Sequence, residues 1–184
     1  MKTKACYCLF ILCSITCVTL NAQKFYTKTG KISFFSATAM ENIEANNRSV
    51  TAMLDSKTGD VQFNVLMKGF EFKKALMQEH FNENYIESDK FPKASFKGLV
   101  VNNSEINYSV DGNYPARVKG QLTIHGQTKD IETSGNITIK GGKPVLNSTF
   151  TVLIADYNIT VQRIHRDNIS KSIKITVDAA LSPL

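Results

Sequence analysis

The sequence predicts an all-β domain of antiparallel strands with one short helix. Apolar and polar residues alternate along most of the chain after Phe25, as they do in strands that bury one face and expose the other. Turn-forming residues, mainly Gly, Asn and Asp, separate these runs at short spacing. One segment, residues 70–83, has helical spacing instead. About eight strands result, a number that suits a closed barrel or a sandwich.

The first 22 residues have the features of a secretory signal peptide. Lys2 and Lys4 provide a positive start, residues 9–20 form an apolar run, and Ala22 is a small residue at the cleavage position. This run is too short to cross a membrane. All four cysteines lie in the same segment. The predicted mature domain, residues 23–184, therefore has no disulfide and no cysteine site, and one apolar core must hold it together.

Three strands are predicted before the helix. The first begins near Phe25 and the second covers residues 50–55. Residues 57–60, Lys-Thr-Gly-Asp, form the turn that leads from the second strand to the third. Apolar residues occupy the alternate positions of the third strand: Val61, Phe63, Val65 and Met67.

The helix is predicted at about 70–83, because its apolar residues fall on one half of a helix. These residues are Phe72, Leu76, Met77 and Phe81. His80 lies on the same half, whereas Glu79 lies on the other half. Pro92 ends the connection to the next strand.

Five more strands are predicted in the second half of the chain. They cover residues 94–101, 117–124, 131–140, 150–154 and 173–179. The turns Asp111-Gly112-Asn113, His125-Gly126 and Gly141-Gly142 are expected to supply the positive φ angles that hairpins need. The short spacing between strands predicts antiparallel neighbours in one domain.

Three motifs resemble the YceI-like family. Residues 87–98, ESDKFPKASFKG, match its Ser-x-x-Phe/Tyr-Pro-x-x-x-Phe junction between helix and strand. Residues 120–129, GQLTIHGQTK, match its G-x-L-T-I-H-G-x-T-K hairpin, and residues 156–159, DYNI, resemble a later motif. Order and spacing agree along the whole mature chain. The resemblance implies an eight-stranded lipocalin-like barrel in the bacterial periplasm, or secreted, that holds a polyisoprenoid or fatty-acid type of amphiphilic lipid.

The strand pattern is compatible with a lipid cavity, because an eight-stranded barrel is about wide enough for one small ligand. Burial of a lipid chain stabilises a complex by about 0.8 kcal/mol per methylene without polar anchors. Gly120 and Gly135 are expected to leave room in the lumen. The side chains expected to contact the lipid are Phe34, Phe63, Val65, Met77, Phe81, Phe96, Leu122, Phe150, Val152 and Ile175. A barrel that these side chains fill completely is the alternative.

A polar collar is expected where the helix meets the barrel mouth. His80 suggests it, because a histidine on the apolar half of a helix is either a satisfied buried side chain or a contact to a ligand head group. The candidate collar residues are His80, Asn82, Asn84 and Tyr85.

No catalytic or metal-binding constellation is recognisable. The three histidines, at positions 80, 125 and 165, lack the short spacings of metal sites. His125 is expected to bond local backbone at its Gly turn, and His165 is expected to be solvated in a polar loop. Glu79 and Glu83 are four residues apart, which is typical of a solvated helix face. We predict a protein that is not an enzyme and has no cofactor and no metal.

The charge pattern limits the partners. The chain has 22 basic and 16 acidic residues, and removal of Lys2 and Lys4 leaves 20 against 16, a net charge of +4. Basic residues are scattered without interleaved aromatics, so we expect no nucleic acid and no stable membrane insertion. A homodimer is compatible with the pattern. The prediction is an exported carrier or sequestering protein for a lipid; the alternative is a stress-related interaction module with a filled barrel.

Overall fold

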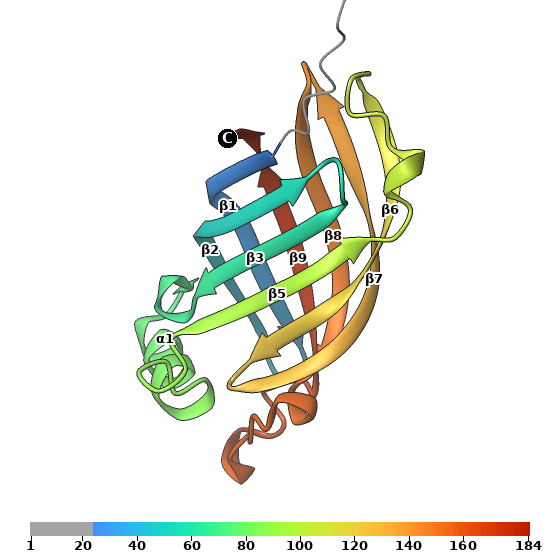
Figure 1. The fold of residues 1–184 in the computed structure, drawn as a ribbon. Helices are drawn as coiled ribbons and strands as arrows, with labels where there is room; N and C mark the ends of the chain where they lie inside the picture. Colours follow the sequence, from blue (N-terminus) through green and yellow to red (C-terminus); the bar gives the residue numbers. More distant parts are fainter. Residues whose placement is uncertain (1–23) are drawn as a thin grey trace, which may run out of the picture.

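Eight long antiparallel strands close into a barrel in the computed structural model, which describes residues 24–184 (Figure 1). The strands are β1 (Lys24–Ala37), β2 (Asn42–Asp55), β3 (Asp60–Leu66), β5 (Lys93–Val100), β6 (Gly112–Ile124), β7 (Gln127–Lys140), β8 (Lys143–Leu153) and β9 (Ser172–Ala180). The pairing of β1 with both β2 and β9 closes the barrel. This architecture confirms the predicted fold class and excludes the sandwich. The predicted signal peptide, residues 1–22, lies outside the described residues, as do the four cysteines.

Two short strands add to the closed barrel, one at each end. β4 (Glu71–Phe72) pairs with β2, and β10 (Ser182–Pro183) pairs with β1. All other strand neighbours are also antiparallel and mostly consecutive in the chain. Short turns join most of them, which is why period-two patterns separated by turn residues predicted the strands.

One end of the barrel is closed by side chains. The loop between β5 and β6, which contains η3 (Asn103–Glu105), lies at this end. The ring of Tyr108 from this loop stacks on Phe25, with 6.3 Å between centroids. The buried core here comprises Phe25, Ala52, Leu54, Val61, Val100, Ile106, Ala116, Ile137, Ile139, Leu146, Ala179 and Leu181. Both the first described residue and the C-terminus lie at this end (Figure 1).

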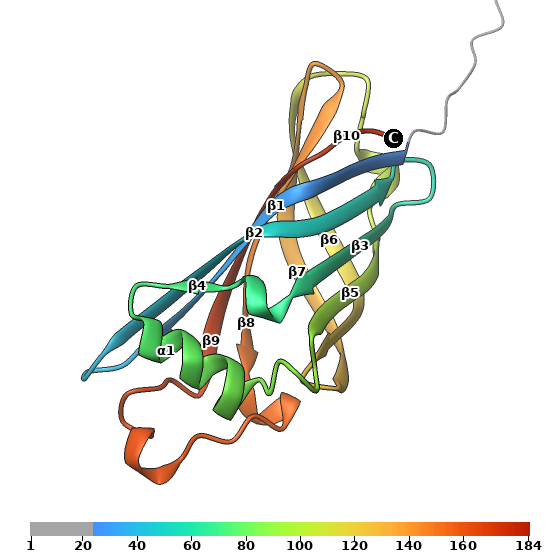
Figure 2. The same ribbon diagram turned by 90° about the vertical axis from the view of Figure 1, so that its left-hand side faces the viewer.

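Three connecting elements surround the opposite end (Figure 2). One is the β1–β2 turn, residues 38–41. The second is α1 (Ala75–His80), which continues into the π-helical turn η2 (Phe81–Tyr85) and follows the short turn η1 (Met67–Gly69). The third is the β8–β9 connection, residues 154–171, which contains η4 (Ile154–Tyr157) and η5 (Arg163–His165). We call the opening between these elements the mouth.

The predicted helix exists, but its predicted start at residue 70 is wrong. Phe72 belongs to β4 and pairs with Ala45 of β2, so its backbone is extended. The Phe72 N–H donates to the Gln78 side chain at 3.2 Å, which joins this strand to the helix. Lys74 caps the helix in an extended conformation. Pairing with the edge of β2 therefore replaces the first turn of the expected helix.

Most of the predicted turn positions are correct. Gly59, His125, Gly126, Gly141 and Gly142 all have positive φ. The exception is residue 112, a glycine that has no positive φ and opens β6 opposite Ile139. The long loop that covers the closed end reaches β6 without a tight hairpin, so no left-handed residue is required there.

Gly120 was expected to widen the lumen, and this expectation is wrong. Gly120 faces Gly98 across the β5–β6 pair, and the Phe96 ring lies against both. A Cβ atom on Gly120 would lie 2.7 Å from Phe96 Cζ and 2.4 Å from the Lys97 carbonyl oxygen. The two glycines therefore make room for a core ring and for close strand approach.

Candidate functional site

An apolar cavity of about 510 Å³ occupies the barrel. Small-molecule sites commonly measure about 300–1,000 Å³. Each of the eight barrel strands contributes inward-facing side chains to its wall, and α1 contributes to the mouth. The barrel is therefore hollow between the closed end and α1, and the side chains do not fill it.

All ten apolar side chains predicted to contact a ligand line this cavity: Phe34, Phe63, Val65, Met77, Phe81, Phe96, Leu122, Phe150, Val152 and Ile175. Eight of these residues lie on strands, and Met77 and Phe81 lie on α1 and at its end. Alternate residues of a strand point to the same face, so the inward set can be derived from position parity. Their contact with a lipid stays a prediction.

Four phenylalanine rings form the cavity wall beneath α1. They are Phe34, Phe70, Phe72 and Phe81, and the five neighbouring centroid distances are between 5.1 and 5.6 Å. Such tilted and edge-on contacts add to the stabilisation from buried area. Phe70 and Phe72 were not among the predicted cavity residues, because the sequence analysis did not identify the extended backbone around β4 that directs them into the barrel. The apolar–polar–apolar order of Phe70, Glu71 and Phe72 is typical of a strand and could have identified both phenylalanines as inward-facing.

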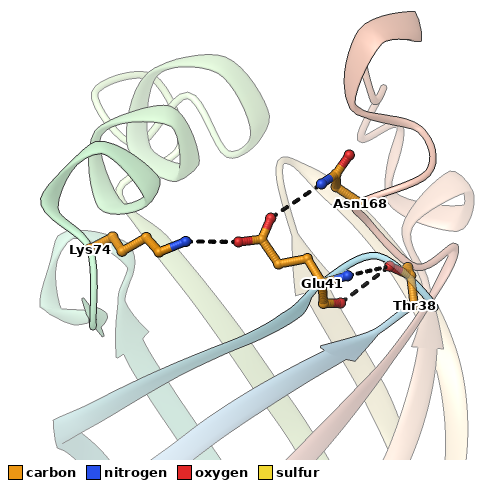
Figure 3. Close-up of polar contacts among 4 residues, drawn as sticks. All are labelled: Thr38, Glu41, Lys74 and Asn168. Carbon is orange, nitrogen blue, oxygen red and sulfur yellow. Dashed lines mark hydrogen bonds and ion pairs between the residues drawn. The ribbon is translucent and has the colours of Figure 1, made fainter.

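Glu41 connects the three elements around the mouth (Figure 3). Its Oε1 atom accepts a hydrogen bond from Lys74 Nζ at 3.0 Å, and its Oε2 atom accepts one from Asn168 Nδ2 at 3.3 Å. Thr38 holds its backbone: the Glu41 N–H donates to Thr38 Oγ1 at 3.1 Å, and the Thr38 N–H donates to the Glu41 carbonyl at 3.0 Å. We call this arrangement the Glu41 latch.

The contacts of the Glu41 latch favour the charged form of the Glu41 carboxyl. The hydrogen bond from Lys74 lowers the pKa of the Glu41 carboxyl below its ordinary value; partial burial opposes this effect, and Asn168 adds to it. Both Lys74 and Asn168 also line the cavity. Sequence reasoning missed the latch, because its partners are 33 and 127 residues away from Glu41.

The predicted collar residues divide into two pairs. His80 and Tyr85 line the cavity, whereas Asn82 and Asn84 do not. The Asn82 side chain donates to the Gln78 carbonyl at 2.8 Å and lines a separate surface hollow behind α1. Residues two apart on a helix point about 200° apart, so Asn82 cannot share a face with His80. Burial raises the pKa of Tyr85.

His165 is the cavity residue that sequence reasoning placed in solvent. It is half-buried and lines the cavity, and its ring centroid is 6.0 Å from that of His80. The two histidines come from α1 and η5, on either side of the mouth. Within residues 24–184, no group of three His, Cys, Asp or Glu side chains is arranged to hold a metal ion.

His125 joins the three family-like motifs. Its Nδ1–H donates to the Tyr157 carbonyl at 3.0 Å, and its Nε2 lies 2.9 Å from Glu87 Oε2. The Phe91 ring packs against it with 4.5 Å between centroids. The expectation of a local backbone bond is wrong, because both partners are more than 30 residues away. The three motifs therefore meet in a cluster of Glu87, Phe91, His125 and Tyr157, which we call the bracket. The bracket holds the end of η2 and the start of the β8–β9 connection against the barrel.

Non-glycine residues with left-handed backbone lie in this bracket or next to it. Glu87, His125 and Asn158 have φ angles of 48°, 50° and 54°, and they are the three non-glycine residues with positive φ between residues 24 and 184. Such backbone persists where surrounding contacts hold it. Burial raises the pKa of Tyr157, and the neighbouring Asp156 adds to this effect.

Comparisons with known proteins support this architecture. A family model described as YceI-like domain matches residues 18–181. Solved structures that share the fold include a polyisoprenoid binding domain from Saccharophagus degradans implicated in plant cell wall breakdown, which is 12% identical with a TM-score of 0.76 over 89% of this chain and 99% of that one. BcnA from Burkholderia cenocepacia is 14% identical with a TM-score of 0.67, over 83% and 96% of the two chains.

A YCEI protein from Campylobacter jejuni is 16% identical with a TM-score of 0.56, over 76% of this chain and 84% of that one. At these identities the likeness concerns the fold. None of the curated proteins matches the sequence. In the part of the chain that the structure describes, no helix is long and apolar enough to cross a membrane.

Proposed function

The chain belongs to the YceI-like domain family, and from this premise we propose that it is an exported, non-catalytic protein that holds one long amphiphilic lipid in its barrel. The apolar cavity of about 510 Å³, open at the mouth, carries this proposal. The polyisoprenoid binding domain from Saccharophagus degradans has the same fold, which supports a polyisoprenoid or fatty-acid type of ligand. The features of residues 1–22 support export to the periplasm or beyond.

We expect the lipid to take one orientation in this site. Its chain lies along the apolar wall toward the closed end, and its head group stays at the mouth, near His80 and Tyr85. About twelve buried methylenes contribute about 10 kcal/mol, before the entropic cost of association is subtracted. The contacts of the head group therefore orient the lipid, while most of the affinity comes from burial of its chain.

The alternative, a stress-related interaction module, required a filled barrel. The observed cavity does not favour it. A lipid carrier and an interaction module also differ in one direct measurement, which is the mass of the protein isolated under native conditions. Co-purified lipid is expected for the carrier.

A tryptophan placed inside the cavity tests the proposal. Val152 and Thr151 are neighbours on β8, and only Val152 lines the cavity. The natural chain has no tryptophan, so each indole is also the only one in its variant. We expect Val152→Trp to weaken the binding of a fluorescent long-chain lipid by about tenfold or more, because the indole occupies the space of several methylenes.

Thr151→Trp, which points outward, is expected to bind like the wild type. Ile175→Trp, on the neighbouring strand β9, is a second blocking variant in case Val152→Trp unfolds, and circular dichroism checks both folds. The proposal fails if the wild type neither co-purifies with lipid nor takes it up. It also fails if both folded blocking variants bind as tightly as Thr151→Trp.

A further inference from the structure

Large apolar side chains are exposed around the mouth. Met40, Leu76 and Ile164 are 72%, 60% and 78% exposed. They are the most exposed large apolar residues among residues 24–184, apart from the C-terminal Leu184. One lies on each of the three elements that surround the mouth: the β1–β2 turn, α1 and η5 (Figure 2). We call these three residues the apolar rim.

Basic side chains accompany the apolar rim. The β1–β2 turn, residues 73–80 and residues 163–171 contain five exposed basic side chains: Lys73, Lys74, Arg163, Arg166 and Lys171. They contain three acidic side chains: Glu41, Glu79 and Asp167. The carboxylate of Glu41 is directed to Lys74 and Asn168 in the latch. Glu83 of η2 and Asp156 of η4, which belong to the same elements, bring the acidic side chains to five, so the mouth as a whole is balanced in charge. The positive charge is local: Arg163 and Arg166 lie beside Ile164 on the β8–β9 connection.

The apolar rim is continuous with the cavity. Leu76 itself lines the cavity, and so do Glu41 and His165, the chain neighbours of Met40 and Ile164. A lipid that leaves the cavity must pass between these three tips. A surface that covers the rim would exclude water from this path, so the lipid chain would stay in apolar surroundings throughout its transfer.

We propose that the apolar rim docks on the surface of an anionic lipid bilayer and that the lipid exchanges there through the mouth. This inference rests on the proposed function and adds a partner to it. Single apolar side chains inserted at the level of the head groups, with basic residues beside them, are the combination that binds anionic membranes at their surface. The three apolar side chains of the rim are separated from one another by the mouth. A protein–protein interface needs a continuous, closely packed patch, so the rim suits a bilayer surface better than a protein partner.

Vesicle flotation with the chain from Gln23 tests the docking. Vesicles of phosphatidylglycerol with phosphatidylethanolamine are compared with vesicles of phosphatidylcholine alone. We expect the wild type to float with the anionic vesicles, less so as salt is raised, and weakly with phosphatidylcholine. We expect the double variant Met40→Asp with Ile164→Asp to lose affinity for the anionic vesicles by a factor of about ten or more.

The matched control is Leu99→Asp with Val110→Asp. Leu99 and Val110 are exposed apolar residues, 42% and 53% exposed, that lie outside the rim, on β5 and in the loop at the closed end. We expect this control to bind vesicles like the wild type. Neither Met40 nor Ile164 lines the cavity, so the rim variant should take up a fluorescent lipid normally in the absence of vesicles.

The docking inference is overturned if the rim variant binds anionic vesicles as well as the control variant does. It is also overturned if binding is equal on phosphatidylcholine and independent of salt. Loss of a wild-type dimer in the rim variant, without any vesicle binding by the wild type, would assign the rim to a second copy and reject the membrane. If the wild type takes up no lipid, the proposed function is contradicted. The docking inference is then judged separately, by whether the wild type binds vesicles through the rim.

Discussion

Tyr108 illustrates at the scale of one residue how the closed end of the barrel is held. Its hydroxyl donates to Asn103 Oδ1 at 2.7 Å, and its ring stacks on Phe25. Burial raises the pKa of Tyr108 to about 12 from an ordinary value of 10.0, and the nearby Asp55 adds to this effect. The neutral phenol is thus the form that the folded protein favours.

A consequence is a loss of stability in strong base. The folded protein retains the Tyr108 proton at a pH where the unfolded chain has released it. The stabilisation is therefore fully present below pH 10 and is lost as the pH rises from 10.0 toward about 12. Burial also raises the pKa of Tyr85 and Tyr157, so we expect more than one delayed step when tyrosinate absorbance is followed in the folded protein, with the late step at about 12 belonging to Tyr108. Tyr108→Phe should remove this late step, and a late step that persists in the variant would contradict the assignment.

The Glu41 latch acts at the scale of secondary-structure elements. It joins the β1–β2 turn, the start of α1 and the β8–β9 connection, which are otherwise separate chain segments (Figure 3). Exposed ion pairs contribute little to global stability, but they can hold mobile elements in one arrangement. Because the pKa of Glu41 is lowered, this contribution is present above the ordinary pKa of 4.5 and is lost as the pH falls below it.

Glu41→Gln is therefore expected to accelerate lipid release. The amide cannot form the ion pair with Lys74, so the elements around the mouth separate more often. We expect the release rate of a fluorescent lipid, measured by stopped flow, to rise about two- to fivefold with little change in melting temperature. Glu132→Gln is the matched control, since Glu132 pairs with Lys119 at 3.1 Å on the outer wall of the barrel. An equal release rate in the wild type and both variants would exclude a gating role.

At the scale of the whole molecule, the two ends of the barrel have different tasks. Side chains form a continuous core at the closed end, whereas at the other end they leave a cavity with an apolar wall. An unfilled apolar cavity lacks the contacts that packed side chains would make. A ligand that binds only the folded state replaces these contacts and shifts the folding equilibrium.

Removal of the lipid should consequently lower the stability of the protein. A ligand present at about 100 times its dissociation constant stabilises the folded state by about 2.7 kcal/mol. We expect differential scanning calorimetry to record a lower melting temperature after delipidation and recovery when the long-chain lipid is added back. The soluble head group alone serves as the control and should not restore it. Equal melting temperatures with and without lipid would mean that the cavity does not take it up.

The cavity wall was more predictable than the mouth. The inward-facing strand residues followed from alternation, because the side-chain direction in a strand depends on position parity and hardly at all on tertiary contacts. Phe70 and Phe72 did not follow, because pairing with the edge of β2 overrode a helical pattern. The position of His165 depended on the path of the β8–β9 connection, for which the sequence has no periodic signal.

About eight antiparallel strands, most of the turn positions, the apolar character of the lumen and the resemblance to a family could all be predicted from the sequence. These properties depend on short-range periodicity and turn chemistry, which are written in neighbouring residues. The hollow lumen, the contacts of Glu41 with Lys74 and Asn168, and the contacts of His125 with three motifs became evident from the three-dimensional structure. The physical reason is that each of these features depends on how distant segments pack, and packing in three dimensions is not encoded by any local repeat.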